Sequence, residues 1–169
     1  MWDTTMMGSV EGELTAGSHD FDALFRAERD GLYRTMLAFT GGRADVAEDA
    51  TAEAFARAYE RRGELRNPIA WIYRVAFRVA IDEVRRDRRR GDPEDSSIPG
   101  ASPELTDLIA ALRQLSPNQR AAIVLRHVAD LEMDEVARRM GTATPTVRVH
   151  LYRGRARLRD LLGSEEADR

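Results

Sequence analysis

Apolar residues recur at intervals of three and four along most of this chain, which is the spacing of an amphipathic helix. Three such stretches fill the first half, at residues 20–41, 47–62 and 68–88. Four more follow in the second half, at residues 105–112, 117–127, 133–140 and 145–162. No stretch alternates apolar and polar residues as a half-buried strand does. The pattern therefore predicts an all-α protein.

Residues that suit helix ends bound several of these stretches. Asn67, Ser116 and Thr144 can each act as an N-cap, because each is followed by a proline suited to the first helical position. Gly141 stands where a left-handed residue commonly ends a helix. Glu132 is a poor N-cap for the helix at 133–140, because its side chain seldom satisfies the free N–H groups there.

Residues 91–103 interrupt the helical pattern with three prolines, two glycines and three serines, which is typical of a flexible linker. The chain therefore divides into two small helical domains, at residues 19–90 and 104–163. We expect residues 1–18 to form a flexible extension, because they are polar and lack apolar periodicity. Residues 164–169 form an acidic tail.

The composition restricts the class of protein. A chain of 169 residues with 43% hydrophobic content can fold without cross-links, and the absence of cysteine excludes disulfides, thiolate zinc sites and cysteine nucleophiles. The longest apolar runs are far shorter than the roughly 20 residues of a membrane span, and no secretory signal pattern begins the chain. We expect a cytoplasmic protein that does not insert into membranes.

Charge is distributed unevenly, although the formal net charge is only −3. Seven arginines and no acidic residue lie between Glu135 and Asp160, and a second basic run occupies residues 85–90. Such patches attract phosphate groups whatever the net charge is.

The segment from 131 to 158 has the pattern of a helix-turn-helix, with a short helix, a glycine turn and a long basic helix. A helix fits the major groove of DNA, where arginine can donate two hydrogen bonds to guanine. A solvated arginine face on a surface helix is the simpler alternative.

Two helices of the first half leave two interpretations open. Trp71 and Phe77 alternate with arginines, which suits the stacking of unpaired bases, but aromatic residues at helical spacing are also typical of a core. The acidic face of the helix at 47–62 is either a docking surface for a basic partner or a solvated surface.

Two groups of motifs resemble the two domains of one protein family. The first group comprises residues 45–50, 53–55, 71–76 and 80–86. The second comprises residues 115–117, 120, 134–137, 141, 146–148 and 151–155. They resemble the sigma-2 and sigma-4 domains of the extracytoplasmic-function (ECF) sigma factors, which belong to the sigma-70 family. The resemblance covers residues 21 to 162, and the domains follow the family's order.

The resemblance implies a role for each group of residues. Contact with the clamp helices of the largest subunit of core RNA polymerase is implied for Glu48, Asp49 and Glu53, and the flap region of the polymerase is implied as a second contact. Capture of the minus-ten promoter element is implied for Arg66, Asn67, Trp71, Arg74, Phe77, Arg78, Arg85 and Arg86. Reading of the minus-thirty-five element is implied for Arg126, Thr144, Thr146, Arg148, Val149, His150, Tyr152, Arg153 and Arg155. An anti-sigma factor is a further implied partner.

The sequence departs from the family pattern at Arg78, where asparagine is common, and at Pro145, Val149 and His150. The leading interpretation is a promoter-specificity subunit of RNA polymerase, and the alternative is a stand-alone helix-turn-helix repressor or activator. An enzyme is disfavoured because the three histidines are scattered and no glycine-rich phosphate loop occurs. We expect no catalytic residue, metal or cofactor.

Overall fold

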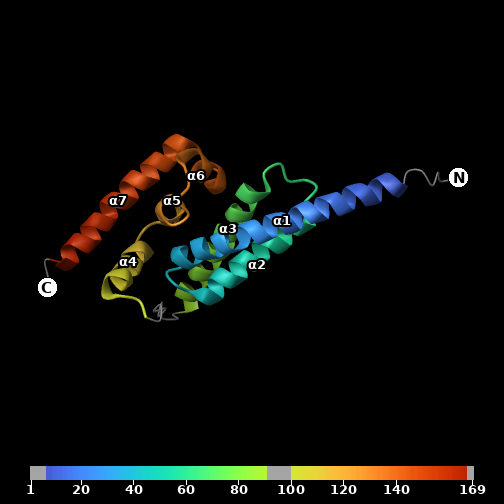
Figure 1. The fold of residues 1–169 in the computed structure, drawn as a ribbon. Coiled ribbons are helices and arrows are strands. Elements are labelled where there is room, and N and C mark those ends of the chain that lie inside the picture. The colour runs from blue at the N-terminus through green and yellow to red at the C-terminus, as the bar shows by residue number, and fades with distance from the viewer. Residues whose placement is uncertain (1–6, 91–99, 167–169) are drawn as a thin grey trace.

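The computed structural model describes residues 7–90 and 100–166, and within them the side chains of 20–87, 89–90 and 100–163. The described residues form seven helices and no strand, as the periodicity predicted (Figure 1). The helices are α1 (Met7–Phe39), α2 (Ala44–Glu60), α3 (Pro68–Arg90), α4 (Pro103–Arg113), α5 (Pro117–His127), α6 (Met133–Met140) and α7 (Thr144–Glu166).

Helices α1, α2 and α3 pack together as a bundle. Helix α2 presents the small residues Ala47, Ala50, Ala54 and Ala58 to the interior, and none of them has exposed surface. Short side chains allow neighbouring helices to approach closely, so larger residues such as Tyr73 fill the space between them.

Helices α4 to α7 form the second half, in which α7 packs against α4, α5 and α6. Val124, Val136 and Val147 have no exposed surface, and they form the centre of this half. Gly154 of α7 lies against Ile123 of α5, where an added Cβ would come within 3.2 Å of the isoleucine side chain. A larger residue at this position would require the Ile123 side chain to shift by a few tenths of an ångström.

The predicted helix ends are largely those observed. The Asn67 side chain accepts a hydrogen bond from the N–H of Ala70 at 3.0 Å, and Ser116 forms a capping box with Gln119. Gly141 ends α6 with a φ of 66°, and Glu132 makes no side-chain cap, both as expected.

Helix α1 differs from the prediction, because it begins at Met7, inside the segment predicted to be a flexible extension. Once residues 20–39 have formed a helix, each added residue gains a hydrogen bond without a new nucleation step. Residues 164–166 of the predicted acidic tail likewise extend α7. Residues 1–6, most of the predicted linker at 91–99, and residues 167–169 lie outside the described residues.

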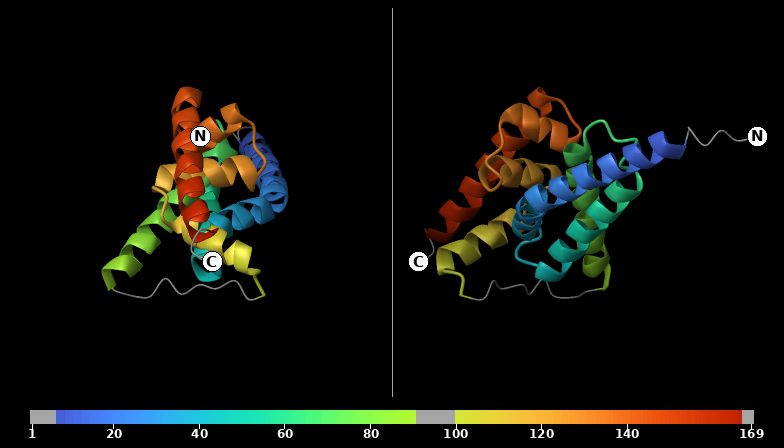
Figure 2. Two further views of the ribbon diagram at one scale, coloured as in Figure 1. Left: turned by 90° about the vertical axis from the view of Figure 1, so that its left-hand side faces the viewer. Right: turned by 45° about the vertical axis from the view of Figure 1, so that its right-hand side comes forward.

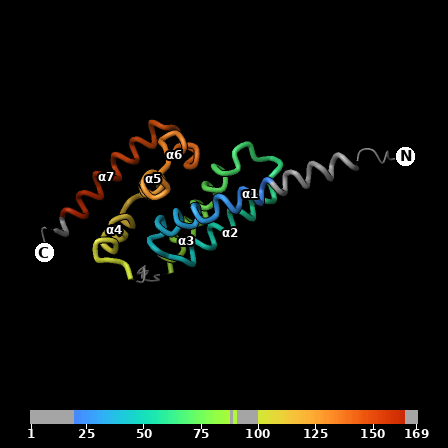
Figure 3. Tube along the Cα trace, in the orientation of Figure 1, coloured from blue at the N-terminus to red at the C-terminus, as the bar shows by residue number. Residues whose placement is uncertain are grey.

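The two halves lie against each other, with α5 next to α1 and α6 next to α3 (Figures 2 and 3). Buried apolar residues of both halves belong to one continuous core, which includes Met36 and Phe77 of the first half and Leu125 and Val136 of the second. We refer to this packing of α5 and α6 on the first half as the closed arrangement.

Candidate nucleic-acid and partner interfaces

Helices α6 and α7 form the helix-turn-helix that the sequence predicted. The turn is closed by hydrogen bonds from the N–H of Gly141 to the carbonyl of Arg138 and from the N–H of Thr142 to the carbonyl of Ala137. Val136 of α6 is buried together with Val147 and Leu151 of α7, so the two helices are held at a fixed angle.

The opposite face of α7 is open to solvent. Tyr152 is 73% exposed and Val149 is 45% exposed, and Arg148 lies one turn before Tyr152 on the same face. Thr146, Arg153 and Arg155 are exposed on adjoining positions, and His150 is half-buried. Most of the residues predicted to read duplex DNA therefore share one accessible side of α7.

The side chain of Thr144 does not have the predicted role of N-cap. The first hydrogen bond of α7 runs from the N–H of Val147 to the carbonyl of Ala143, so Ala143 precedes the helix and Thr144 is its first residue. The Thr144 hydroxyl donates to the Asp134 carboxylate at 2.7 Å. The side chain thus ties the start of α7 to α6 and does not cap the helix.

Two other residues predicted to meet duplex DNA form contacts within the second half of the chain. Arg126 donates to the carbonyl of Leu131 at 3.0 Å and lies 3.8 Å from the Asp130 carboxylate. Arg155 donates to Nε2 of His127 at 3.1 Å, which joins α7 to the end of α5. Burial, together with the charges of Arg155 and Arg126, lowers the pKa of His127, so the neutral ring that accepts this bond is favoured.

Helix α3 carries the second basic face. Arg74, Arg78 and Arg85 are exposed, and no ion pair holds any of them within the described ranges. Arg74, Arg78 and Trp71 line one side of a hollow of about 630 Å³, and Arg57 and Arg61 of the α2 end line the other. Such a hollow can accept a base together with its phosphate.

The remaining residues predicted to meet the minus-ten element differ in their surroundings. Arg66 is exposed, Asn67 caps α3, and Arg86 forms an ion pair with Glu83 at 2.5 Å. Phe77 is only 6% exposed, and its ring packs edge-on against Phe39 at 4.9 Å. Of the two aromatic residues on α3 that were predicted to meet DNA, Phe77 belongs to the core in the closed arrangement, and Trp71 is half-buried.

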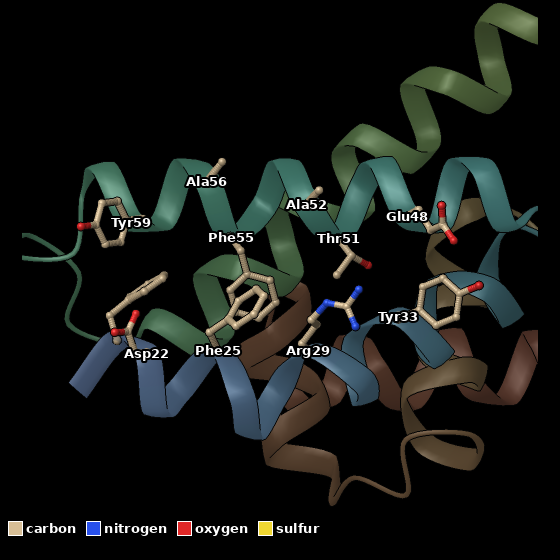
Figure 4. A pocket seen from close by; sticks show the side chains of 11 residues that line it. Asp22, Phe25, Arg29, Tyr33, Glu48, Thr51, Ala52, Phe55, Ala56 and Tyr59 are labelled. Atoms are coloured by element: carbon tan, nitrogen blue, oxygen red, sulfur yellow. The ribbon is translucent and has the colours of Figure 1, made fainter. Parts of the chain in front are cut away.

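One of the acidic residues of α2, Glu48, borders a groove that the sequence did not suggest. Glu48 and Asp49 are exposed, whereas Glu53 is paired with Arg57 at 2.6 Å. Next to Glu48, a groove of about 480 Å³ runs between α1 and α2 (Figure 4). Its rim includes Phe25, which is 37% exposed, and Tyr59, which is 44% exposed.

Five aromatic residues line this groove, and four of them make edge-on contacts at centroid distances between 4.8 and 6.4 Å. These four are Phe21 and Phe25 of α1 and Phe55 and Tyr59 of α2, and the fifth is Tyr33 of α1. Each pair is spaced by four residues, so this spacing on two neighbouring helices was the signal that could have revealed the groove. An exposed apolar groove beside acidic residues suits a protein partner.

The described residues hold no cluster of His, Cys, Asp and Glu that could bind a metal ion. None of the helices in the described ranges combines the length and apolar character that a membrane crossing requires.

Comparison with known proteins identifies both halves. The family model described as Sigma-70 region 2 matches residues 24–90, and the model described as Sigma-70, region 4 matches residues 105–158. The chain is 32% identical to the ECF RNA polymerase sigma factor SigM of Mycobacterium tuberculosis, over 85% of this chain and 77% of that protein. It is 31% identical to the ECF RNA polymerase sigma factor SigE of Mycolicibacterium smegmatis, over 90% of this chain but only 65% of that protein.

Two solved structures share the fold. The sigma factor RpoE of Bartonella quintana, in complex with the anti-sigma factor NepR, matches with a TM-score of 0.66 and 24% identity over 85% of this chain and 97% of that chain. CnrH, in complex with the cytosolic domain of CnrY, matches with a TM-score of 0.67 and 22% identity over 89% of this chain and 94% of that chain. The two-part helical architecture is therefore that of these proteins.

Proposed function

Because the chain belongs to the ECF sigma factors of the sigma-70 family, we propose that it directs core RNA polymerase to specific promoters and initiates transcription there. The observation that carries the proposal is the presence in one chain of two separate basic helix faces and an acidic, apolar groove. A stand-alone repressor needs only one DNA-reading face. The protein itself makes and breaks no bond, and it acts in the bacterial cytoplasm.

The polymerase contact is made by the acidic face of α2. Glu48 and Asp49 are exposed and free to meet a basic surface, and the aromatic groove beside Glu48 offers apolar contact area. This combination supports docking of the clamp helices of the largest polymerase subunit. Leu105 and Leu108 of α4, which are also exposed, support a second contact of residues 104–163 with the flap region.

The minus-ten element is captured by α3 within residues 19–90. The unpaired guanidinium groups of Arg74 and Arg78 attract phosphate, while the accessible part of Trp71 stacks on a base of the melted strand. Arg66, Arg85 and Arg86 extend the basic surface, and the Asn67 side chain holds the start of α3.

The minus-thirty-five element is read as duplex DNA by α7. Arg148, Tyr152 and Arg153 meet the base edges and the nearby phosphates, with Thr146, Val149 and His150 on the same helix. Arg126 supports the reading helix from α5, and Arg155 supports it through its hydrogen bond to His127.

An anti-sigma factor regulates the protein. The support is that the two solved structures with this fold were determined as complexes, one with the anti-sigma factor NepR and one with the cytosolic domain of CnrY.

Promoter-specific transcription with purified core polymerase tests the proposed function. We expect the protein to produce transcripts from defined start sites, and Asp49→Lys to abolish them because it reverses the charge of the docking face. Asp160→Lys, at an exposed position of the second half, is the matched control for a general charge effect. Tight binding of a duplex operator by the free protein, without any change in polymerase behaviour, would replace this function with that of a stand-alone regulator.

A further inference from the structure

One carboxylate lies among the arginines of the hollow between the end of α2 and α3. The hollow of about 630 Å³ is lined by Arg57, Glu60 and Arg61 on the α2 side and by Trp71, Arg74, Val75 and Arg78 of α3. Its volume lies within the range of pockets that hold small ligands. All seven residues belong to the first half of the chain, so the second half does not line this hollow.

The two walls of the hollow present opposite hydrogen-bonding groups. Arg74 and Arg78 lie one turn apart on α3, and both are exposed. A guanidinium group only donates hydrogen bonds, whereas the Glu60 carboxylate on the facing wall only accepts them. Arg61, next to Glu60, is placed to meet a phosphate. A base that fits both walls must therefore present donors toward Glu60 and acceptors toward α3.

The position of Glu60 is unfavourable for the stability of α2. Glu60 is the last residue of the helix, where the unpaired carbonyl groups already carry partial negative charge. The neighbouring arginines do not neutralise it among the described residues. Arg57 pairs with Glu53 at 2.6 Å, and Arg62 lies over the Tyr59 ring at 4.1 Å and donates to the Tyr59 carbonyl. The Glu60 carboxylate is therefore available to a ligand.

Guanine is the DNA base whose hydrogen-bonding groups match both walls. Its Watson–Crick edge carries two adjacent donors, N1–H and N2–H, which suit the two oxygens of a carboxylate. Its other edge carries the acceptors O6 and N7, to which arginine can donate two hydrogen bonds. Adenine, cytosine and thymine each place an acceptor beside the only donor group of the Watson–Crick edge, and that acceptor would repel the carboxylate. This edge is accessible only in an unpaired base, whose ring can stack on Trp71.

We propose that this hollow selects one unpaired guanine of the minus-ten strand, with Glu60 accepting hydrogen bonds from N1–H and N2–H and with Arg74 or Arg78 donating to O6 and N7. This assignment rests on the proposed function for the capture of the strand by α3. It goes beyond that function because it names the base and the residue that selects it. A carboxylate among arginines weakens the general attraction for phosphate, so Glu60 favours binding only where it meets the donors of a base.

Binding of short fluorescent oligothymidylates to the purified protein tests the base preference. Four probes carry guanine, adenine, cytosine or thymine at one central position, and fluorescence anisotropy gives the affinity for each probe. We expect the guanine probe to bind about fivefold or more tightly than the other three, which is the lower end for a bidentate contact to a base. Equal affinities for the four probes, or a preference for another base, would overturn the proposal.

Glu60→Gln should remove the guanine preference, because an amide presents one acceptor and one donor group in place of two acceptor oxygens. The matched control is Glu64→Gln, which removes the same charge from an exposed residue that does not line the hollow. The measured quantity is the ratio of the affinities for the guanine and thymine probes, which a general change of charge leaves the same. A guanine preference that persists in Glu60→Gln would show that Glu60 does not select the base.

A free guanine nucleotide carries the same base, and competition with guanosine monophosphate distinguishes this source from the promoter strand. The free nucleotide lacks the neighbouring phosphates that the other arginines of α3 attract. We therefore expect it to displace the guanine probe only at concentrations far above the Kd of the probe. Displacement at concentrations close to that Kd would identify a nucleotide-binding site and overturn the assignment to the promoter strand.

Transcription with core polymerase separates this proposal from the function on which it rests. The templates carry a randomised minus-ten segment and a transcribed barcode that identifies each segment. We expect guanine to be enriched at one position of the captured strand with the unaltered protein and with Glu64→Gln, but not with Glu60→Gln. Transcripts from defined start sites without a guanine-enriched position would confirm the sigma function and overturn the proposal. A guanine preference in oligonucleotide binding without any promoter-specific transcript would support the base site and contradict the sigma function.

Discussion

The faces of α3 and α7 carry similar side chains in different surroundings. On α7, Arg148 and Tyr152 project into solvent from a helix whose other side is buried. On α3, Arg74 and Arg78 are also exposed, but Phe77 between them is buried and the α6 turn lies against Arg74. Side-chain chemistry alone therefore does not decide which residues of a basic helix are available to DNA.

The largest expected effect comes from disrupting the packing of the buried side of α7. Val147→Asp places a carboxylate at a position with no exposed surface, and we expect a loss of about 4 kcal/mol in the free energy of unfolding. Urea unfolding followed by circular dichroism measures it. Val149→Asp, two residues along at a 45% exposed position, should change stability by no more than about 0.5 kcal/mol. Equal losses in both variants would contradict the assignment of the buried and exposed sides.

The reading face of α7 is tested by removing its arginines. Arg148→Ala and Arg153→Ala should each weaken binding of the sigma–polymerase complex to duplex promoter DNA by about 1 to 3 kcal/mol, if each side chain contacts a base edge. Fluorescence anisotropy with a labelled minus-thirty-five duplex gives the affinities. Arg157→Ala, on the same helix but outside the proposed face, serves as the control. Unchanged affinity in both variants would place the reading face elsewhere.

Substitution on the basic face of α3 should weaken binding of single-stranded DNA and not of duplex DNA. Trp71→Ala should weaken capture of a single-stranded minus-ten oligonucleotide by the sigma–polymerase complex by about 1 kcal/mol, the lower end for base stacking, because the ring is already half-buried. Affinity for the minus-thirty-five duplex should not change, and Trp71→Phe should restore much of the loss. A loss of duplex affinity in Trp71→Ala would remove the distinction between the two faces.

Local features of both faces could be predicted from the sequence. The helices, the Asn67 cap and the left-handed Gly141 depend on neighbouring residues, and the family resemblance supplied the two-domain order. The role of the Thr144 hydroxyl was missed because its acceptor, Asp134, lies on another helix. The burial of Phe77 follows the core interpretation that its helical spacing left open. The contact of Arg139 with Tyr73 arises from long-range packing, which helical periodicity does not encode.

The smallest effect concerns pH and the support of Arg139. Hydrogen bonds from Arg139, then from Arg138, outweigh burial and lower the pKa of Glu135 below its usual value of 4.5. Because the folded pKa is the lower one, this stabilisation is fully present above pH 4.5 and disappears as the pH falls through the folded value. Glu135→Gln should therefore lower the free energy of unfolding by less than about 1 kcal/mol at neutral pH.

The free energy of unfolding of Glu135→Gln should approach that of the unaltered protein as the pH falls into the acid range. Urea unfolding at a series of pH values measures both free energies. Arg148 and Arg153 of α7 form no ion pair within the described ranges, so this titration leaves their exposure unchanged. If the difference in free energy of unfolding stays constant from neutral to acid pH, Glu135 acts through its shape and not its charge. The contact of Arg139 with α3 would then have no pH-dependent support from Glu135.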